Sequence, residues 1–540
     1  MAITELPISL FLIFFLSIFS NFASLASNDT ICNLTPYPSF CKSNSPSNSQ
    51  GNNIHEYGRF FARKSLSSSK KLLSLVSSHL QSSSNFSNST ILALQDCHLL
   101  ADLNRDFWSR TLKKINSTDN LSSSDAENFH TLVSATLTNH ETCLKSLQET
   151  TSTPDDDLLT HLSNGTKFYS ISLAIFKRGW VNGKTERNLG ELRSNHVWGQ
   201  RLYDVIRIRG RKLLQLAPDN VVVSQIVVVN PDGSGNFTTI NDAVAAAPNN
   251  TGGVNGFFVI HMVSGVYEEY VSIPKNKQYL MMIGDGINQT IITGNNSVAG
   301  GSTTFNSATF AVVGNGFVAV NMTFRNTAGA INHQAVALRS GADLSAFYNC
   351  SFEGYQDTLY THSLRQFYRN CDIYGTVDFI FGNAAVVLQD CNIFPRLPLQ
   401  NQFNAITAQG RTDINQNTGT SVHNCTITAA TDLATNNGIT KTYLGRPWKQ
   451  YSRTVYMQSF MGSLIDPAGW VQWSGDFALD TLYYAEFDNQ GPGSNTSNRV
   501  TWSGYHVITS IDAVNFTVAN FIFGDAWLPA TGVPFSADLL

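Results

Sequence analysis

Two patterns of apolar and polar positions divide the chain near residue 214. In the first part, three long segments at 53–80, 90–115 and 125–147 place apolar residues close to helical spacing. Short stretches rich in serine and asparagine separate these segments, which is typical of antiparallel neighbouring helices. We therefore predict an all-α antiparallel bundle as the N-terminal domain.

The second part is built from short β-prone segments. Residues 221–229 form a strongly β-prone run, and from Phe257 onward segments rich in Val, Ile, Phe and Thr alternate with Gly and Asn turns. Residues 240–247 predict a short helix, which we expect to cover an open end of the β structure. The tail from about Asp512 is expected to pack along the outside.

One segment of this second part recurs with a period of about 21 residues. Its first copy, FYNCSF at 347–352, is followed by YRNCDI at 368–373 and QDCNI at 389–393, and NCTI at 424–427 resembles a later copy. A short alternating segment with such a period predicts a parallel β-helix, in which each coil stacks on the preceding coil.

Two aspartates lie one such repeat apart. Asp357 stands in GYQDTLY (354–360), and Asp378 stands in GTVDFIFG (375–382), 21 residues later. Neighbouring strands of a sheet are about 4.8 Å apart, so residues one coil apart become spatial neighbours. The repeat therefore predicts that the two carboxyl groups lie close enough to act as a paired acid and nucleophile.

The N-terminus has the features of a secretory signal peptide. Residues 8–19 are apolar apart from two serines, a stretch too short to span a bilayer comfortably, and small residues allow cleavage after Ala26. Abundant Asn-x-Ser/Thr sequons and eight cysteines fit an oxidising compartment. We expect a secreted glycoprotein with no membrane contact after signal cleavage; an uncleaved anchor is the alternative.

Composition and charge narrow the function further. From Gln215 to the end the chain has 13 Lys and Arg against 22 Asp and Glu, a net charge of −9, whereas the remainder has a net charge of +5. This difference indicates either electrostatic attraction between the halves or simple drift of composition. No cysteine pair forms CxxC, no His stands at zinc-ligand spacing, and no G-x-S-x-G, phosphate-loop or nucleic-acid motif occurs. We expect no metal, no cofactor and no nucleic-acid partner.

Five segments of the second part together resemble the signature of plant pectin methylesterases, in the same order and with matching spacing. They are GVYEE (265–269), HQAVAL (333–338), GYQDTLY (354–360), GTVDFIFG (375–382) and LGRPW (444–448). The resemblance extends from about Val227 to the C-terminus and implies a right-handed parallel β-helix. It also implies hydrolysis of the C6 methyl esters of galacturonate units in pectin (homogalacturonan), in the plant cell wall or apoplast.

The resemblance assigns roles to five polar residues. Asp378 corresponds to the nucleophile, and Arg446 would keep it ionised and oriented, since a nearby cation lowers a carboxylate pKa. Asp357 would be the protonated partner, because two close carboxylates do not both ionise readily; it would protonate departing methanol and then activate water. Gln334 and Gln356 would donate hydrogen bonds to the oxyanion of the tetrahedral intermediate. Gln334 and Arg446 are also expected to contact the substrate.

The resemblance further implies a sugar-binding cleft with aromatic walls. Tyr360, Phe381, Trp448 and Trp470 are expected to offer ring faces to the sugar, and core positions are the alternative for these rings. Trp448 lies inside a matching motif, and Thr304 matches a substrate-contact position.

The helical bundle resembles a pectin methylesterase inhibitor domain in its helical pattern, its cysteine order and its Asp96-Cys97 sequence, which implies an all-α four-helix bundle. The pairing in that family implies two disulfides, Cys32–Cys41 and Cys97–Cys143. The bundle is therefore expected to act as a pro-region or intramolecular inhibitor of the second part.

A basic sequence joins the two parts. Arg211-Lys212-Leu213-Leu214 matches the processing motif of the family, so a processing protease is expected to cut after it; a solvated run of charge is the alternative. The expected domains are a signal peptide (1–26), the inhibitor-like bundle (27–185), a linker (186–214) and the catalytic β-helix (215–540).

The other four cysteines lie in the repeated segments. The family pairs Cys350 with Cys371, and such a bridge would join the two coils that carry the aspartates. For Cys391 and Cys425, inward-facing free thiols are at least as favourable as a bridge, because buried cysteine behaves as a small apolar residue.

Two other functions remain open from the sequence. Another β-helix carbohydrate enzyme, such as a polygalacturonase or pectate lyase, would create new chain ends in place of methanol. A binding or inhibitory protein with an inactive β-helix would be expected to have lost at least one catalytic residue, and all five are present.

Overall fold

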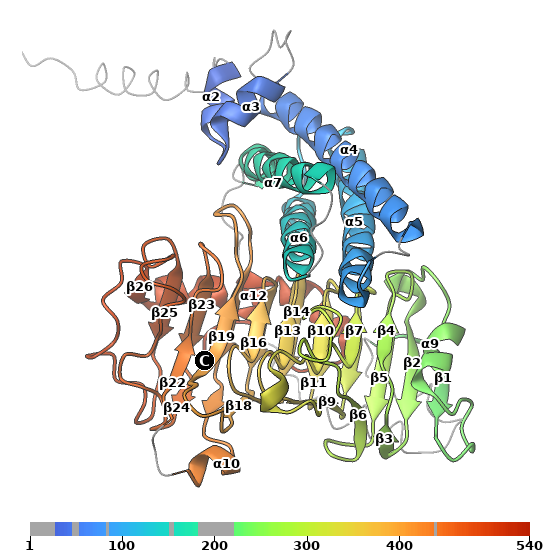
Figure 1. The fold of residues 1–540 in the computed structure, drawn as a ribbon, viewed down its shortest axis with the longest axis vertical. Coiled ribbons are helices and arrows are strands. Elements are labelled where there is room, and N and C mark those ends of the chain that lie inside the picture. Colours follow the sequence, from blue (N-terminus) through green and yellow to red (C-terminus); the bar gives the residue numbers. More distant parts are fainter. Residues whose placement is uncertain (1–27, 46–52, 83–85, 151–155, 182–220, 437–439) are drawn as a thin grey trace, which may run out of the picture.

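A helical bundle stands against the side of a long β-helix (Figure 1). The computed structural model describes residues 28–45, 53–82, 86–150, 156–181, 221–436 and 440–540. The expected signal peptide, the linker and the processing sequence at 211–214 lie outside the described residues.

Four long helices form the bundle. They are α4 (Ile54–Gln81), α5 (Asn88–Ile115), α6 (Ser123–Gln148) and α7 (Asp156–Phe176), which continues as the π-helix η2 (Lys177–Val181). Each helix packs against the next, and α7 packs back against α4. The side chains of Asn53, Ser87 and Ser122 cap three of the helices by accepting hydrogen bonds from first-turn N–H groups. The predicted four-helix bundle is confirmed, with α7 as the helix whose limits the pattern did not predict.

Two disulfides brace the bundle. Cys32–Cys41 joins the short helices α2 (Asn28–Asn33) and α3 (Pro38–Asn44), and Cys97–Cys143 joins α5 to α6. Both bridges are those that the resemblance implies. The second spans 46 residues of sequence against 9 for the first, so it restricts the unfolded chain more strongly.

The second part is a parallel β-helix of three sheets, and a complete coil contributes one strand to each sheet in turn. Sheet A contains β1 (Val223–Val229), β2 (Phe257–Met262), β5 (Leu280–Gly284), β8 (Val318–Val320), β11 (Ser345–Tyr348), β14 (Arg365–Arg369), β17 (Ala385–Gln389), β20 (Gly419–His423), β23 (Arg453–Met457), β25 (Tyr483–Phe487) and β26 (Tyr505–Val507). Sheet B contains β3 (Gly265–Tyr267), β6 (Thr290–Gly294), β9 (Thr323–Asn326), β12 (Ser351–Glu353), β15 (Asp372–Gly375), β18 (Asn392–Pro395), β21 (Thr426–Ile427) and β24 (Phe460–Met461). Sheet C contains β4 (Val271–Ile273), β7 (Phe310–Val312), β10 (Leu338–Ser340), β13 (Leu359–Thr361), β16 (Ile380–Gly382), β19 (Asn404–Gln409) and β22 (Thr442–Gly445).

The repeated segment of the sequence marks the corner between sheets A and B. At this corner Asn349, Asn370, Asp390 and Asn424 all have positive φ, between 51° and 54°. Asparagine and aspartate adopt this left-handed conformation more readily than other non-glycine residues, because their short polar side chains can hydrogen-bond locally. A buried cysteine follows each corner residue and packs in the core. The sequence period is thus the length of one coil.

The four cysteines of this ladder, Cys350, Cys371, Cys391 and Cys425, are buried free thiols. The Cys350–Cys371 bridge implied by the resemblance is therefore wrong, and Cys391 and Cys425 adopt the free state, one of the two left open for them. Each sulfur lies 3.4–3.6 Å from a main-chain carbonyl oxygen of the preceding coil. A disulfide would require neighbouring sulfurs to turn toward each other with a dihedral of about 90°.

Short helices cover one end and the outer face of the β-helix. As predicted, α9 (Ile240–Ala246) packs against β1 and β2 at one end (Figure 1). The C-terminal tail runs along sheet A, where α11 (Ser510–Ala513) and α12 (Val518–Phe521) bury its outward-facing apolar residues. One more helix, α10 (Thr431–Ala434), follows β21. Among the described helices, none is both long and apolar enough to cross a membrane.

Candidate active site

Asp357 and Asp378 occupy equivalent positions on neighbouring coils. Each lies two residues before a strand of sheet C, and the pairing of Leu359 with Ile380 sets both in one register. The N–H of Asp357 donates to the carbonyl of Val377 at 3.1 Å, which ties the two turns together. Both aspartates have positive φ, 61° and 53°, a sparsely populated conformation that recurs at functional sites.

Arg446 holds one of these aspartates in a two-point ion pair. It directly follows β22, two strands beyond β16 in sheet C. Its Nε and Nη2 donate to Oδ1 and Oδ2 of Asp378 at 2.7 and 2.8 Å. The Asp378 side chain is only 7% exposed, so this ion pair both orients the carboxylate and shields it from water.

The surroundings give the two aspartates different tendencies to ionise. Burial raises the pKa of Asp357 well above its usual range, and the negative charge of Asp378 raises it further. Burial also raises the pKa of Asp378, but the hydrogen bonds and the charge of Arg446 oppose that rise. Because only Asp378 is paired with a guanidinium, a single proton shared by the two groups resides on Asp357.

Two glutamines present unused amide groups next to this pair. Gln356 precedes Asp357, and its carbonyl accepts a hydrogen bond from the N–H of Ala335, the neighbour of Gln334, at 3.2 Å. Both glutamine side chains are partly exposed, and neither amide has a hydrogen-bond partner among the described residues. Two free N–H donors beside a carboxylate are what an oxyanion site requires. In the described part of the chain no cluster of His, Cys, Asp or Glu is arranged to hold a metal ion.

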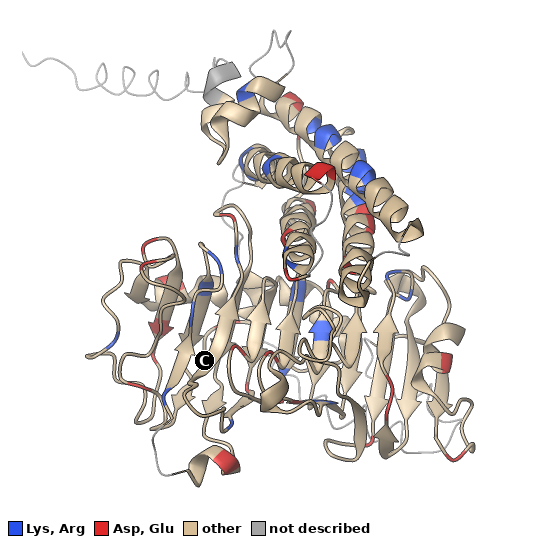
Figure 2. Cartoon of the chain, in the orientation of Figure 1, with Lys and Arg blue, Asp and Glu red and all other residues tan. Residues whose placement is uncertain are grey.

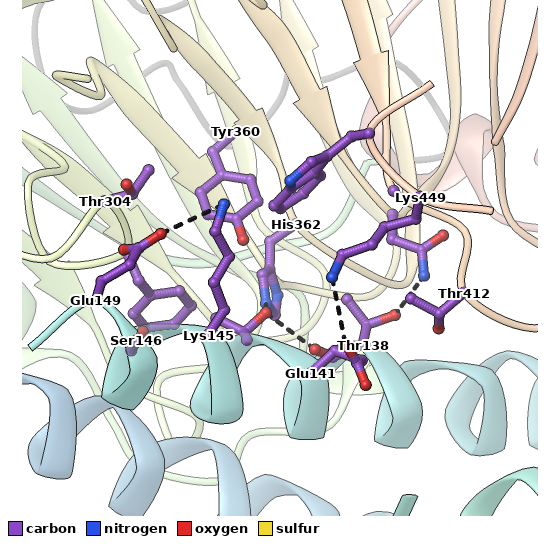
Figure 3. A pocket seen from close by; sticks show the side chains of 15 residues that line it. Thr138, Glu141, Lys145, Ser146, Glu149, Thr304, Tyr360, His362, Thr412 and Lys449 are labelled. Atoms are coloured by element: carbon purple, nitrogen blue, oxygen red, sulfur yellow. Dashed lines mark hydrogen bonds and ion pairs between the residues drawn. The ribbon is translucent and has the colours of Figure 1, made fainter. Parts of the chain in front are cut away.

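Aromatic side chains extend this site along the outer face of sheet C. Tyr360 and Phe381 stack with ring centroids 4.1 Å apart, and Trp448 meets Phe381 edge-on at 6.0 Å. Thr304 lines a pocket together with Tyr360 and Trp448 (Figure 3). We call the surface formed by these four residues the cleft; it unites four of the residues that the sequence predicts as substrate contacts.

Trp470 is not part of the cleft. It is 1% exposed in the core of the β-helix, where it stacks on Tyr484 at 4.1 Å and donates from Nε1 to Glu486 at 3.3 Å. The expectation of a sugar-contacting Trp470 is therefore wrong. Trp473 packs on the cleft side in its place, with the Arg446 guanidinium 4.3 Å from its ring centroid. The sequence around these tryptophans forms no regular strand, so alternation could not separate the inward ring from the outward one.

Helix α6 of the bundle lies directly over the cleft (Figure 3). Lys145 Nζ lies 4.4 Å from the ring centroid of Trp448, and its charge acts on both aspartates. Thr142 Oγ1 lies 3.0 Å from Nε2 of His362, a neighbour of the aromatic residues. The cavity left between α6 and sheet C measures about 30 Å³, room for a few water molecules and not for a sugar.

Polar contacts on both sides of the cleft fasten the bundle to the β-helix. Asp96 of α5 accepts a hydrogen bond from Thr303 at 2.6 Å. Ser170 of α7 donates to Asp413 at 2.5 Å. These groups are buried, so the contacts are formed only while the two domains are together.

The ion pairs across this interface have the opposite polarity to the net charges of the two halves. The bundle supplies the carboxylates of Asp102, Asp106 and Glu141, and the β-helix supplies Lys275 and Lys449. Figure 2 shows basic residues of the bundle along α4, away from the β-helix. The opposite net charges of the two halves therefore do not explain these ion pairs.

Comparisons with known proteins agree with this geometry. A family model described as Pectinesterase matches residues 226–525, more than half of the chain. The chain belongs to the pectinesterase family. A second family model, plant invertase/pectin methylesterase inhibitor, matches residues 26–175 of this pectinesterase. It is thus a carboxylic ester hydrolase with an attached inhibitor-like domain.

Relatives of this pectinesterase contain both domains or the β-helix alone. It is 54% identical to "Probable pectinesterase/pectinesterase inhibitor 20" of Arabidopsis thaliana over 95% of this chain and 94% of that protein. It is 53% identical to Pectinesterase 2 of Citrus sinensis over 83% and 82% of the two chains. The solved pectin methylesterase from carrot is 58% identical, covers 58% of this chain and 98% of its own, and has a TM-score of 0.57. The carrot chain thus corresponds in length to the β-helix domain, and it is folded without an attached bundle.

Proposed function

We propose that this pectinesterase hydrolyses the C6 methyl ester of galacturonate units in pectin and releases methanol. The observation that carries the proposal is the pair Asp357 and Asp378, with Arg446 bound at two points to Asp378 alone. An oriented carboxylate beside a protonated carboxyl group supplies a nucleophile and an acid within one coil spacing. The solved carrot relative, named a pectin methylesterase, supports pectin as the substrate.

In the first half-reaction, Asp378 attacks the carbonyl carbon of the ester. The carbonyl oxygen becomes an oxyanion, which accepts hydrogen bonds from the side-chain amides of Gln334 and Gln356. As the tetrahedral intermediate collapses, the bond from carbon to the methoxy oxygen breaks, and Asp357 donates its proton to that oxygen. Methanol leaves, and the galacturonyl group stays on Asp378 as an acyl-enzyme.

In the second half-reaction, water removes the acyl group. Asp357, now ionised, takes a proton from the water while the water oxygen attacks the acyl carbon, again with an oxyanion at the two glutamines. The bond to Asp378 then breaks, which restores its carboxylate beside Arg446. Asp357 is protonated once more, and the product carries a free carboxyl group.

The bundle acts, in this proposal, as an intramolecular inhibitor. Helix α6 fills the cleft, and Lys145 covers the face of Trp448 that a sugar ring would use. The charge of Lys145 also lowers the pKa of Asp357 and so disfavours the protonated acid that the reaction needs. The remaining cavity of about 30 Å³ cannot admit a galacturonate unit.

Removal of the bundle would open the cleft. We therefore retain the expected domains as a proposal, with a secreted precursor, a cut by a processing protease at the basic sequence 211–214, and an active domain at 215–540 in the cell wall. The match of the inhibitor model to 26–175 and of the pectinesterase model to 226–525 supports a boundary between these ranges.

Methanol release from highly methylated pectin tests the reaction. The segment 215–540 should release methanol, the full chain should release at least about tenfold less, and Asp378→Asn should lower the rate of the segment by at least about 1000-fold. Full activity of Asp378→Asn would contradict its role as nucleophile. New reducing ends without methanol would favour cleavage of the glycosidic bond instead.

A further inference from the structure

A second row of side chains lies on the floor of the cleft beside the aromatic residues. His362 lies two residues after Tyr360, and Asn383 lies two residues after Phe381. The N–H of Asn383 donates to the carbonyl of His362 at 3.0 Å, so the two stand on adjacent coils. Both are buried beneath α6, with exposures of 1% and 2%. The His362 ring meets the Tyr360 ring edge-on at 5.2 Å and so continues the aromatic surface.

Each of these side chains forms a hydrogen bond with a threonine hydroxyl of α6. Asn383 Nδ2 donates to Thr138 Oγ1 at 2.8 Å. The hydroxyl of Thr142 also lies 2.9 Å from the carbonyl of Thr138, which can only accept. With that hydroxyl as the donor to the carbonyl, we assign the proton of the 3.0 Å contact to Nε2 of His362. Burial lowers the pKa of His362 well below its ordinary value, in agreement with a neutral ring.

The other polar atoms of the two side chains are used within the β-helix. Nδ1 of His362 lies 2.9 Å from Oγ of Ser363. Oδ1 of Asn383 accepts hydrogen bonds from Gln409 at 3.0 Å and from Thr418 at 2.5 Å. The groups that face the cleft are therefore two neutral N–H donors, Nε2 of His362 and Nδ2 of Asn383. They lose their protein partners when the bundle leaves, and an unpaired donor in a substrate-filled site is costly.

We propose that His362 and Asn383 form a subsite that donates hydrogen bonds to hydroxyl oxygens of a pectin sugar, and that Thr142 and Thr138 imitate those hydroxyls. The proposal rests on the function proposed above. The two threonines lie one helical turn apart, about 6 Å along α6, and the two donors lie one coil apart, about 4.8 Å.

The sugar hydroxyl fits these donors for two reasons. A pyranose that stacks on Tyr360 carries hydroxyl oxygens at its edge, next to the position of His362. The donors are neutral amide and imidazole groups, which suit the uncharged oxygens of a methylated substrate, whereas a carboxylate is typically bound by arginine or lysine.

Kinetics of the segment 215–540 test the subsite. His362→Phe keeps the ring shape and removes the donor, so KM for highly methylated pectin should rise about five- to tenfold with kcat within about twofold. Asn383→Asp keeps the oxygen bound by Gln409 and Thr418, removes the donor, and should have the same effect. Ser363→Ala removes the other hydrogen bond of His362 and should leave KM unchanged.

Three kinetic outcomes would overturn the subsite. KM could stay unchanged in both variants, or kcat could fall at constant KM, which would indicate a role in the chemistry or in folding. A change in KM confined to weakly methylated pectin would mean that the donors bind a carboxylate. If the unaltered segment released no methanol, the proposed function would fail separately. In that case, calorimetry would measure the Kd of a methyl-esterified hexagalacturonate for the unaltered segment and for its His362→Phe variant. Equal Kd values would overturn the subsite.

The proposal that threonine hydroxyls of α6 imitate sugar hydroxyls is tested in the full chain. Thr142→Val keeps the side-chain shape and removes the hydroxyl, so the ratio of full-chain to segment methanol release should rise about fivefold. In a His362→Phe background the same change should leave that ratio unaltered, because the partner is already absent. An equal rise in both backgrounds would overturn the imitation.

Discussion

At Asp378, two opposing effects act on one carboxyl group. Burial raises its pKa, whereas the two hydrogen bonds and the charge of Arg446 lower it. Asp357 experiences burial and the charge of Asp378 without a bound guanidinium, so its pKa lies well above the usual range. The assignment of nucleophile and acid within the pair therefore depends on which aspartate Arg446 reaches.

Replacing Arg446 with glutamine should move the acidic limb of the pH–rate profile to higher pH. Without the guanidinium the pKa of Asp378 rises further, so the ionised nucleophile is present only at higher pH. At pH 5 the kcat/KM of the segment 215–540 for methanol release should fall by at least about tenfold, and the loss should be smaller at pH 7. Lys441→Gln removes an exposed lysine near the other end of β22 and serves as the control. An acidic limb with an unshifted midpoint would contradict this account.

Loss of the Trp470 ring should lower the stability of the segment 215–540, whereas loss of the Trp473 ring should lower its activity. Trp470→Ala removes a buried, stacked ring and should lower the free energy of unfolding of the segment by about 3–5 kcal/mol, measured by urea denaturation. Trp473→Ala should change that free energy by less than about 1 kcal/mol. It should lower kcat/KM instead, because the ring packs against the Arg446 guanidinium. Equal destabilisation by the two changes would show that both rings are structural.

At the scale of elements, the coil converts sequence spacing into geometry. The left-handed corner at Asn349, Asn370, Asp390 and Asn424 keeps successive coils in register. That register brings Asp357 beside Asp378 and His362 beside Asn383, although each pair is 21 residues apart in sequence. The helical repeat of α6 fits the coil spacing. Thr138 and Thr142, one helical turn apart, contact Asn383 and His362, one coil apart.

The disulfide between α5 and α6 should affect inhibition without affecting the catalytic domain. Replacing Cys97 and Cys143 with serine should destabilise the bundle by about 4 kcal/mol, the loop-entropy value for a separation of 46 residues. Methanol release by the full chain should then rise toward that of the segment. The matched change at Cys32 and Cys41, a bridge of 9 residues away from the cleft, should have a smaller effect. Full-chain activity that stays low in the first variant would contradict this.

At the scale of the whole molecule, docking of the bundle changes the protonation of a group at the interface. Asp96 of α5 is 2% exposed, and burial raises its pKa to about 7. Hydrogen bonds from Thr303 and Ser146 and the charge of Arg339 oppose this rise, and the charge of Glu149 adds to it. Undocking removes Thr303 and the cover of the β-helix, so the pKa returns toward its usual value near 3.8. The docked state therefore binds a proton that the undocked state releases.

Inhibition should consequently weaken as the pH rises from about 4 to about 7 and then stay constant. A pKa raised in the docked state favours docking in acid, and docking weakens by up to about tenfold per pH unit until Asp96 ionises in both states. The measurement is the ratio of full-chain to segment methanol release between pH 5 and 8. Asp96→Asn should flatten this ratio, and an unaltered rise in that variant would show that other groups are responsible.

The pattern along the chain was sufficient for both folds and for the pairing of the two aspartates. Apolar spacing indicated the bundle, and the Asn-Cys repeat indicated the coils and placed Asp357 beside Asp378. The resemblance to pectin methylesterases added Arg446. The pattern could not predict that Trp470 is buried. The loop around this residue has no alternation of apolar and polar positions that would distinguish inward from outward side chains. The free state of Cys350 and Cys371 was missed for a related reason, since the orientation of each sulfur depends on the carbonyl of the preceding coil.

The sequence by itself therefore determined the features that depend on residues close along the chain: the helical and coil periods, the corners and the order of the motifs. Only the tertiary structure decided which helix enters the cleft, which hydroxyls meet His362 and Asn383, and which domain supplies the acids of the interface ion pairs. These contacts join surfaces that exist only after each domain has folded. Net charge, a sum over the whole surface, does not specify which side chains such surfaces present to each other.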